Sequence, residues 1–184
     1  MKNVLSIMIQ KLRIMNKILL GFAFLLMFHI SLAQDENSTI GLRGGGVSGM
    51  TVKLIDADLR AMEIILGYQR NGLKMVGMVQ RYKPIKTDRI SNLYVFSGLG
   101  ARAGFERYDK EETQVIDGIT YYSYRRITTP VVGGDMIIGL EYQFESVPFN
   151  VSLDYKPYME FFGEKFFRID FWDIGFSIRY VINQ

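Results

Sequence analysis

Apolar and polar residues alternate with a period of two along almost the whole chain after residue 38, and no stretch keeps the spacing of an amphipathic helix. This alternation predicts an all-β fold. The four prolines fall near predicted strand ends, where a missing backbone donor is tolerated. The predicted strands are residues 39–45, 50–55, 61–69, 73–83, 92–107, 131–144, 149–158 and 169–182.

The two faces of the later strands differ, because one face is apolar while the other carries full charges. From Asp135 to Phe144, one face holds Asp135 and Glu141, and the other is entirely apolar. Such a face packs either a soluble core or membrane lipid. We favour lipid, because aromatic residues gather near the strand ends, as they do where a membrane meets water. These residues are Tyr142, Phe144, Phe149, Trp172 and Tyr180.

If the apolar faces meet lipid, the charged faces point into an eight-stranded barrel, whose interior is just wide enough for side chains to fill. The sequence therefore predicts a polar, salt-bridged interior without an open pore, because buried charges must be paired. Glu141 is the predicted centre, with Arg102 and Arg179 as its candidate partners. The predicted inward charges are Arg43, Lys53, Glu63, Arg102, Glu106, Asp135, Glu141, Asp154, Lys156, Asp173 and Arg179.

Residues 1–33 have the three parts of an export signal: basic residues, an apolar run over residues 18–28, and Ser31 to Ala33 as a small-residue cleavage site. The apolar run is too short for a spanning helix, which needs about 20 residues. We expect cleavage after Ala33, which leaves residues 34–184 as one barrel domain. Met15 is as good a start as Met1, since residues 15–33 already hold all three parts. An export signal before eight alternating strands predicts a transmembrane barrel of the outer membrane.

Loss of this segment changes the charge and the available chemistry. The 22 basic residues fall to 18 and face 19 acidic ones, so the net charge becomes −1. No run of Lys and Arg remains, which excludes nucleic acid as a partner. His29 is the only histidine and the chain has no cysteine, so zinc sites, cysteine nucleophiles and histidine triads are excluded from residues 34–184. We expect no enzyme, no cofactor and no metal; an enzyme would need a Ser–Lys or paired-carboxylate mechanism.

The longest connection, residues 108–130, is the predicted site of contact with an extracellular or envelope protein. Barrels of this kind keep short turns and both chain ends in the periplasm, which places this connection outside. Its composition and its Asp117-Gly118 pair predict a protruding hairpin or a mobile loop. The glycines at 44–46 and 98–104 lack the Lys and Ser or Thr of a phosphate loop. We interpret them as a turn and as room on the inward face.

Several segments resemble a known family: Gly41-Leu42-Arg43-Gly44-Gly45, the run from Ile138 to Phe144 that leads to Leu153-Asp154-Tyr155-Lys156-Pro157, and Phe176 to Tyr180. The chain resembles the small outer-membrane β-barrel proteins of Gram-negative bacteria, particularly those of the Bacteroidetes. The likeness covers most of residues 38–182. It implies an eight-stranded barrel and no specific activity.

Three functions are compatible with these features. The leading prediction is a structural or interaction protein anchored in outer-membrane lipid. The alternative is a secreted or periplasmic soluble β-barrel that binds a small apolar ligand, which requires an apolar interior and a polar exterior. A subunit of a secretion apparatus built on a small barrel would share the features of the leading prediction. The sequence leaves the oligomeric state and the ligand open.

Overall fold

The computed structural model describes residues 37–85, 92–116 and 119–182, so the predicted export signal in residues 1–33 lies outside the described residues. No helix in these ranges is long and apolar enough to cross a membrane. Every helix or strand element assigned in them is a β-strand. The strands are β1 (Asn37–Gly44), β2 (Ser48–Ile55), β3 (Arg60–Gln69), β4 (Gly72–Pro84), β5 (Leu93–Ile116), β6 (Ile119–Gln143), β7 (Phe149–Tyr155), β8 (Tyr158–Phe161), β9 (Phe167–Asp170) and β10 (Ile174–Val181).

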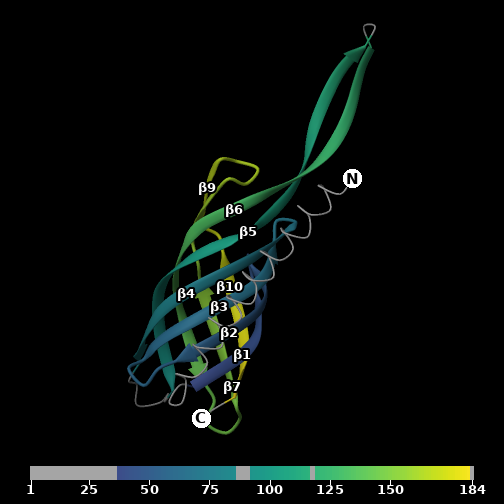
Figure 1. Cartoon of the computed structure of the whole chain (residues 1–184). Coiled ribbons are helices and arrows are strands. Elements are labelled where there is room, and N and C mark those ends of the chain that lie inside the picture. The colour runs from purple at the N-terminus through teal and green to yellow at the C-terminus, as the bar shows by residue number, and fades with distance from the viewer. Residues whose placement is uncertain (1–36, 86–91, 117–118, 183–184) are drawn as a thin grey trace, which may run out of the picture. The chain divides into compact units, whose positions relative to one another are not determined.

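Eight of these strands form a closed antiparallel ring (Figure 1). Strands β1 to β7 pair in sequence order, and β10 pairs with both β7 and β1. At the closure Thr39 lies opposite Val181, and the amide of Ile182 donates to the carbonyl of Ser38 at 2.8 Å. The prediction of an all-β, eight-stranded, up-and-down antiparallel barrel is confirmed.

The last two predicted strands are each divided in two by the structure. β7 and β8 keep the same register against β6 and are separated by Lys156 and Pro157. Between β9 and β10, three residues (Phe171 to Asp173) stand opposite these two, which is the geometry of a β-bulge. Because of the extra residue, the even-numbered side chains of β9 face inward, whereas in β10 the odd-numbered side chains do. Trp172 therefore lies at the bulge, between the end of β9 and the start of β10.

The predicted ends of the fifth and sixth strands at residues 107 and 131 are also wrong. Both strands continue as one hairpin, with residue pairs from Gly104 and Val131 to Ile116 and Ile119. The charged residues of this hairpin favoured a loop in the sequence prediction. Its β-branched and aromatic residues favour extended backbone instead. The hairpin projects beyond the barrel, at the end opposite to Asn37 and Val181 (Figure 1). We call these two ends of the barrel the hairpin end and the Asn37 end.

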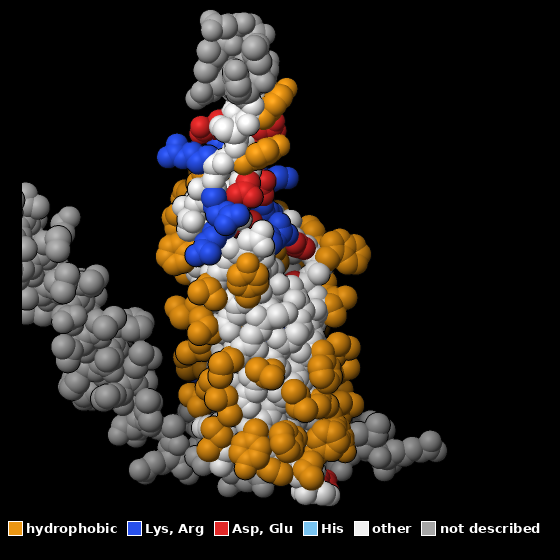
Figure 2. All heavy atoms as spheres, turned by 90° about the vertical axis from the view of Figure 1, so that its right-hand side faces the viewer, with side chains coloured by type: hydrophobic (Ala, Val, Ile, Leu, Met, Phe, Trp, Pro, Cys, Tyr) orange, Lys and Arg blue, Asp and Glu red, His pale blue; other side chains and the backbone are white. Residues whose placement is uncertain are grey.

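Burial alternates residue by residue along the ring, most regularly in β3, where every second side chain is buried. The side chains that point outward are mainly large and apolar, such as Leu42, Met62, Met136 and Phe176. Figure 2 shows these side chains around the barrel wall, with nearly all of the visible charged side chains above them on the hairpin. The barrel thus carries apolar side chains outside and charged side chains inside.

Candidate functional site

The interior charges form the candidate site, because burying an ion is costly unless it is paired. The structure places all eleven predicted residues inside the barrel, each no more than 3% exposed. They belong to two clusters at different levels along the barrel. Every strand of the ring except β4 contributes at least one of the eleven, so residues that are distant in sequence meet in each cluster.

The first cluster lies toward the Asn37 end and consists of Lys53, Glu63, Glu141 and Arg179. Lys53 Nζ lies 3.2 Å from Glu141 and 3.4 Å from Glu63. Arg179 lies 2.6 Å from Glu63 and 3.5 Å from Glu141. Tyr82 accepts a hydrogen bond from Lys53 at 2.6 Å and donates one to Glu141 at 2.8 Å. Two cations therefore contact two anions, and the cluster has no net charge.

The second cluster begins with Arg43, which spans from β1 to two aspartates. Its guanidinium lies 2.6 Å from Asp154 and 3.1 Å from Asp173. Lys156 lies 3.0 Å from Asp173 and 3.0 Å from Asp135. The bulge positions Asp173 for this role, because it turns that carboxylate inward between the two cations.

The second cluster continues toward the hairpin end through Arg102, which pairs with Asp135 and lies 2.9 Å from Glu160. Glu160 also contacts Lys74 at 3.4 Å. Arg168 from β9 reaches Glu106 on β5 at 2.9 Å and Glu160 at 3.7 Å. Within the barrel five cations of this cluster meet five anions, and Arg168 also contacts the exposed Glu164 at 3.4 Å.

The predicted pairing of Arg102 with Glu141 is wrong. Arg102 lies opposite Gly133 on β6, whereas Glu141 lies opposite Tyr94. Eight residues along β6 separate these two levels, which is about 26 Å of strand. Glu141 instead pairs with Lys53 and with Arg179, its other predicted partner.

Lys74, Glu160 and Arg168 complete the second cluster but are absent from the sequence prediction. Glu160 and Arg168 lie beyond or next to the breaks in the last two strands, where the alternation is interrupted. Lys74 lies on the inward face of β4, which also carries the apolar Val76 and Met78. Because polar and apolar residues share this face, the alternation alone does not mark it as the charged face. The outward Leu73, Met75 and Val79 of the same strand are the signal that identifies Lys74 as inward-facing.

Buried apolar residues stand between the two clusters on one side of the barrel. On β3 Ile65 follows Glu63, on β4 Val76 and Met78 follow Lys74, and on β6 Ile137 lies between Asp135 and Glu141. On the other side small residues such as Ser177 occupy this level. The interior therefore contains two ionic layers, with apolar side chains between them on one side of the barrel.

Each carboxylate of the two clusters lies against a cation. Among the residues described, no group of three or more His, Cys, Asp or Glu side chains could hold a metal ion.

Comparisons with known proteins give little family information. No protein-family model matches the chain, and no curated protein matches it. A solved structure to which the chain is similar is the crystal structure of the N-terminal β-barrel domain of Pseudomonas aeruginosa OprF. The two are 13% identical, with a TM-score of 0.42, over 81% of this chain and 98% of that chain. The Bacteroidetes family stays a prediction, and the barrel fold rests on the strand pairing above.

Proposed function

We propose that the chain is an integral outer-membrane β-barrel protein whose barrel anchors the β5–β6 hairpin at the cell surface. The observation that supports this most directly is the inversion of its faces. A soluble barrel buries apolar side chains, whereas this one buries ion pairs and exposes Leu, Met, Ile and Phe. Exposing so much contiguous apolar surface to water is unfavourable, and lipid removes that cost.

The height of the apolar wall fits a bilayer. On β6 the outward side chains from Val132 to Tyr142 are apolar or glycine. This segment spans about 33 Å along the strand and, at a tilt of about 40°, about 25 Å along the barrel axis. The apolar band of known outer-membrane barrels is also about 25 Å tall. On the described strands, outward charges lie near the strand ends or on the hairpin: Arg60, Arg81 and Lys83 toward the Asn37 end, and Arg107 with the charged residues of the hairpin toward the other end.

Aromatic pairs at the Asn37 end support the same placement. Tyr142 packs edge-on against Phe144 with ring centroids 4.9 Å apart, and Phe149 packs edge-on against Tyr180 at 5.5 Å. Amphipathic rings of this kind occupy the membrane–water interface. The alternative, a soluble barrel that binds an apolar ligand inside, requires the reverse arrangement of faces. The two ionic layers inside the barrel also favour an anchor over a channel.

The proposed role is structural or in interaction, and we propose that the protein is not an enzyme. The hairpin from residue 105 to 130 is the element that extends furthest from the barrel. Among the described residues, no strand pairs with either outer edge over most of this length, so a partner strand could pair there. Exposed Tyr122 and Tyr124 with the ion pair between Asp109 and Arg126 offer both apolar and charged contacts.

The single tryptophan tests the membrane placement directly, because Trp172 is 86% exposed on the outer wall. Purified full-length protein is reconstituted in vesicles with brominated acyl chains, and its fluorescence is measured. We expect strong quenching by the brominated lipid and little by aqueous iodide. The matched control is the double variant Trp172→Phe, Tyr122→Trp, which moves the fluorophore to the hairpin and should show the opposite pattern.

The second readout is electrophoretic mobility of the envelope fractions with and without boiling. A heat-modifiable band in the outer-membrane fraction supports the proposal. A soluble band without heat modification, together with iodide access to Trp172, would overturn it.

A further inference from the structure

Three outward cations lie together on the neighbouring strands β3 and β4 (Figure 1), at the Asn37 end of the outer wall. The alternation of the two strands places Arg60, Arg81 and Lys83 on the outward face. The apolar wall of these strands ends with the directly paired Met62 and Val79, which are 64% and 59% exposed. Arg60 and Arg81 form the next outward pair, and Lys83 follows on β4. We call these three cations the cation patch.

Two members of the cation patch, Arg60 and Arg81, lie directly opposite each other in the ladder. The Tyr82 amide donates to the Leu59 carbonyl at 2.7 Å, which makes the two arginines a non-hydrogen-bonded pair. In pairs of this type the Cα atoms are only about 4.5 Å apart and the side chains lie closer. Like charges placed directly opposite each other destabilise a sheet. Two guanidinium groups at this separation therefore favour an anion that both can contact.

The neighbouring carboxylates leave part of this positive charge unpaired. Asp58 lies 3.7 Å from Arg60, and the two side chains are 70% and 66% exposed. The backbone amide of Asp56 donates to the Arg60 carbonyl at 2.8 Å, so a second acid lies near the patch. Among the described residues, none forms an ion pair or a side-chain hydrogen bond with Arg81 or Lys83. Three cations thus meet two carboxylates, and two of the cations can take an anion from outside.

A like-charged pair on the hairpin differs from the cation patch in its surroundings. Lys110 lies opposite Arg125, and Arg125 lies 3.8 Å from Glu112. These side chains project beyond the barrel, where water and salt screen their charges. The cation patch instead adjoins the apolar wall. Long cationic side chains at such a boundary lay their stems on apolar surface and extend their charges to the level of the lipid headgroups.

We propose that the cation patch binds the phosphate of an anionic phospholipid in the leaflet at the Asn37 end of the barrel. Arginine suits phosphate because its guanidinium can donate two parallel hydrogen bonds to the phosphate oxygens. Met62 and Val79 adjoin the patch and contact the acyl chains of the same lipid. A free anion makes only the first of these contacts. A zwitterionic lipid brings a cation of its own, which the unpaired charge of the patch disfavours.

This inference rests on the proposed function, because it requires the outer wall to lie in lipid. Insertion that places the hairpin outside turns the cation patch toward the periplasmic leaflet. Quenching by a neutral lipid tests the insertion, and the difference between an anionic and a neutral lipid tests the patch. The two claims can therefore fail separately.

The experiment measures tryptophan quenching by brominated lipids in equimolar vesicles of phosphatidylcholine and phosphatidylglycerol. Bromine is carried by one lipid in the first preparation and by the other lipid in the second. The reporter is full-length protein with Trp172→Phe and Met62→Trp, which moves the fluorophore beside Arg60. We expect phosphatidylglycerol to occupy this position at least about three times as often as phosphatidylcholine. The unaltered protein reports from Trp172, next to β10 and four strands from β4 in the ring, and should show little preference.

Paired variants of the reporter identify the residues responsible. Arg60→Gln with Arg81→Gln should lower the preference to about one, because the opposed guanidinium groups are lost. Lys110→Gln with Arg125→Gln is the matched control, since it removes the same two charges from the opposed pair on the hairpin. The control should keep the full preference. Inorganic phosphate, added at constant ionic strength, should not displace phosphatidylglycerol.

Heat-modifiable migration checks that each variant is folded. If Met62→Trp does not fold, Val79→Trp provides the reporter on β4. Equal quenching by the two brominated lipids overturns the inference and leaves the membrane placement intact. Absence of quenching by either lipid overturns the membrane placement and this inference with it. The assignment to a lipid phosphate is also overturned if the hairpin control loses the preference equally, or if inorganic phosphate displaces the lipid.

Discussion

Replacing Glu141 with Gln removes one charge from the first cluster while leaving its volume unchanged. The carboxylate is fully buried and accepts hydrogen bonds from Lys53, Tyr82, Gln143 and Asn150, with Arg179 at 3.5 Å. After the change, Lys53 and Arg179 share Glu63 as their only carboxylate, and the cluster carries one uncompensated positive charge.

The expected cost follows from that uncompensated charge. Removing one partner of a buried ion pair typically destabilises a protein by about 3–5 kcal/mol. The matched control is Glu112→Gln on the hairpin, whose carboxylate is 41% exposed and lies 3.8 Å from Arg125. Exposed pairs of this kind contribute about 0–1 kcal/mol. The two variants make the same chemical change and differ only in burial.

The assay is urea unfolding in lipid vesicles, followed by the fluorescence of Trp172 and by heat-modifiable migration. Adding Lys53→Met to Glu141→Gln restores neutrality to the cluster, and we expect it to recover part of the lost stability. If Glu141→Gln costs no more than Glu112→Gln, the claim that paired interior charges hold the barrel together is refuted.

Three further predictions concern the hairpin, the interior and the strand packing. Replacing residues 108–128 with an Asn-Gly turn should leave the folded barrel intact, as judged by heat-modifiable migration, because the barrel ladder ends near Phe105 and Pro130; loss of barrel folding would contradict this. In planar bilayers the protein should show no steady conductance, since paired charges from several strands lie across the interior at two levels; a stable open channel would contradict an interior closed by these ion pairs. Gly139→Ala should destabilise by about 1–3 kcal/mol, because its Cβ would overlap the Phe96 ring and the Leu153 carbonyl. The control Gly77→Ala, with open space at that position, should be neutral or stabilise by up to about 1 kcal/mol in the same urea assay.

The sequence was sufficient to predict the strands and their faces because the period-two alternation is a local property. Asp135 and Glu141 are inward simply because they are an even number of residues apart on one strand. The same reasoning fails where the alternation is interrupted. The bulge at Phe171 to Asp173 adds one residue, so Arg168 faces inward although it is an odd number of residues from Asp173.

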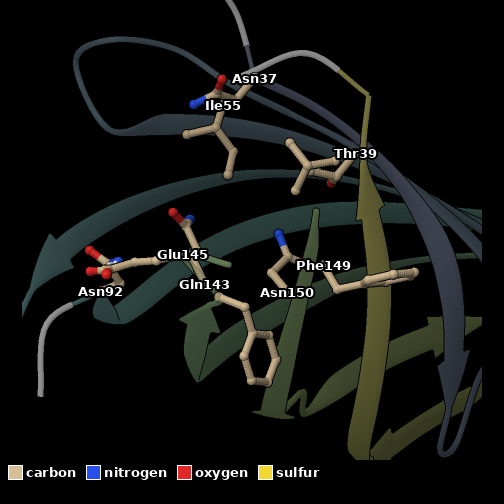
Figure 3. A pocket seen from close by; sticks show the side chains of 10 residues that line it. Asn37, Thr39, Ile55, Asn92, Gln143, Glu145, Phe149 and Asn150 are labelled. Atoms are coloured by element: carbon tan, nitrogen blue, oxygen red, sulfur yellow. Dashed lines mark hydrogen bonds between the residues drawn. The ribbon is translucent and has the colours of Figure 1, made fainter. Parts of the chain in front are cut away.

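Partners inside the barrel are harder to predict, because they depend on register between strands. Glu141 on β6 meets Lys53 on β2 across the barrel, and no local pattern connects these two residues. Arg102 is opposite in charge and equally inward, yet its position on β5 places it level with Asp135. A pocket at the Asn37 end (Figure 3) has the same origin, since Thr39 and Asn150 line it together only after β1 and β7 have both paired with β10.

Both clusters depend on closure of the barrel, because each becomes neutral only when ions from several strands have come together. Lys53 and Arg179 come from β2 and β10, and their shared anions come from β3 and β6, so pairing is incomplete until the ring is complete. A slip of one residue in any strand turns its charges toward lipid, and a slip of two residues moves them away from their partners. Either error leaves unpaired ions in an apolar environment, at a cost of several kcal/mol each. The interior charges therefore favour the correct register over shifted ones, because a shifted register leaves buried ions unpaired.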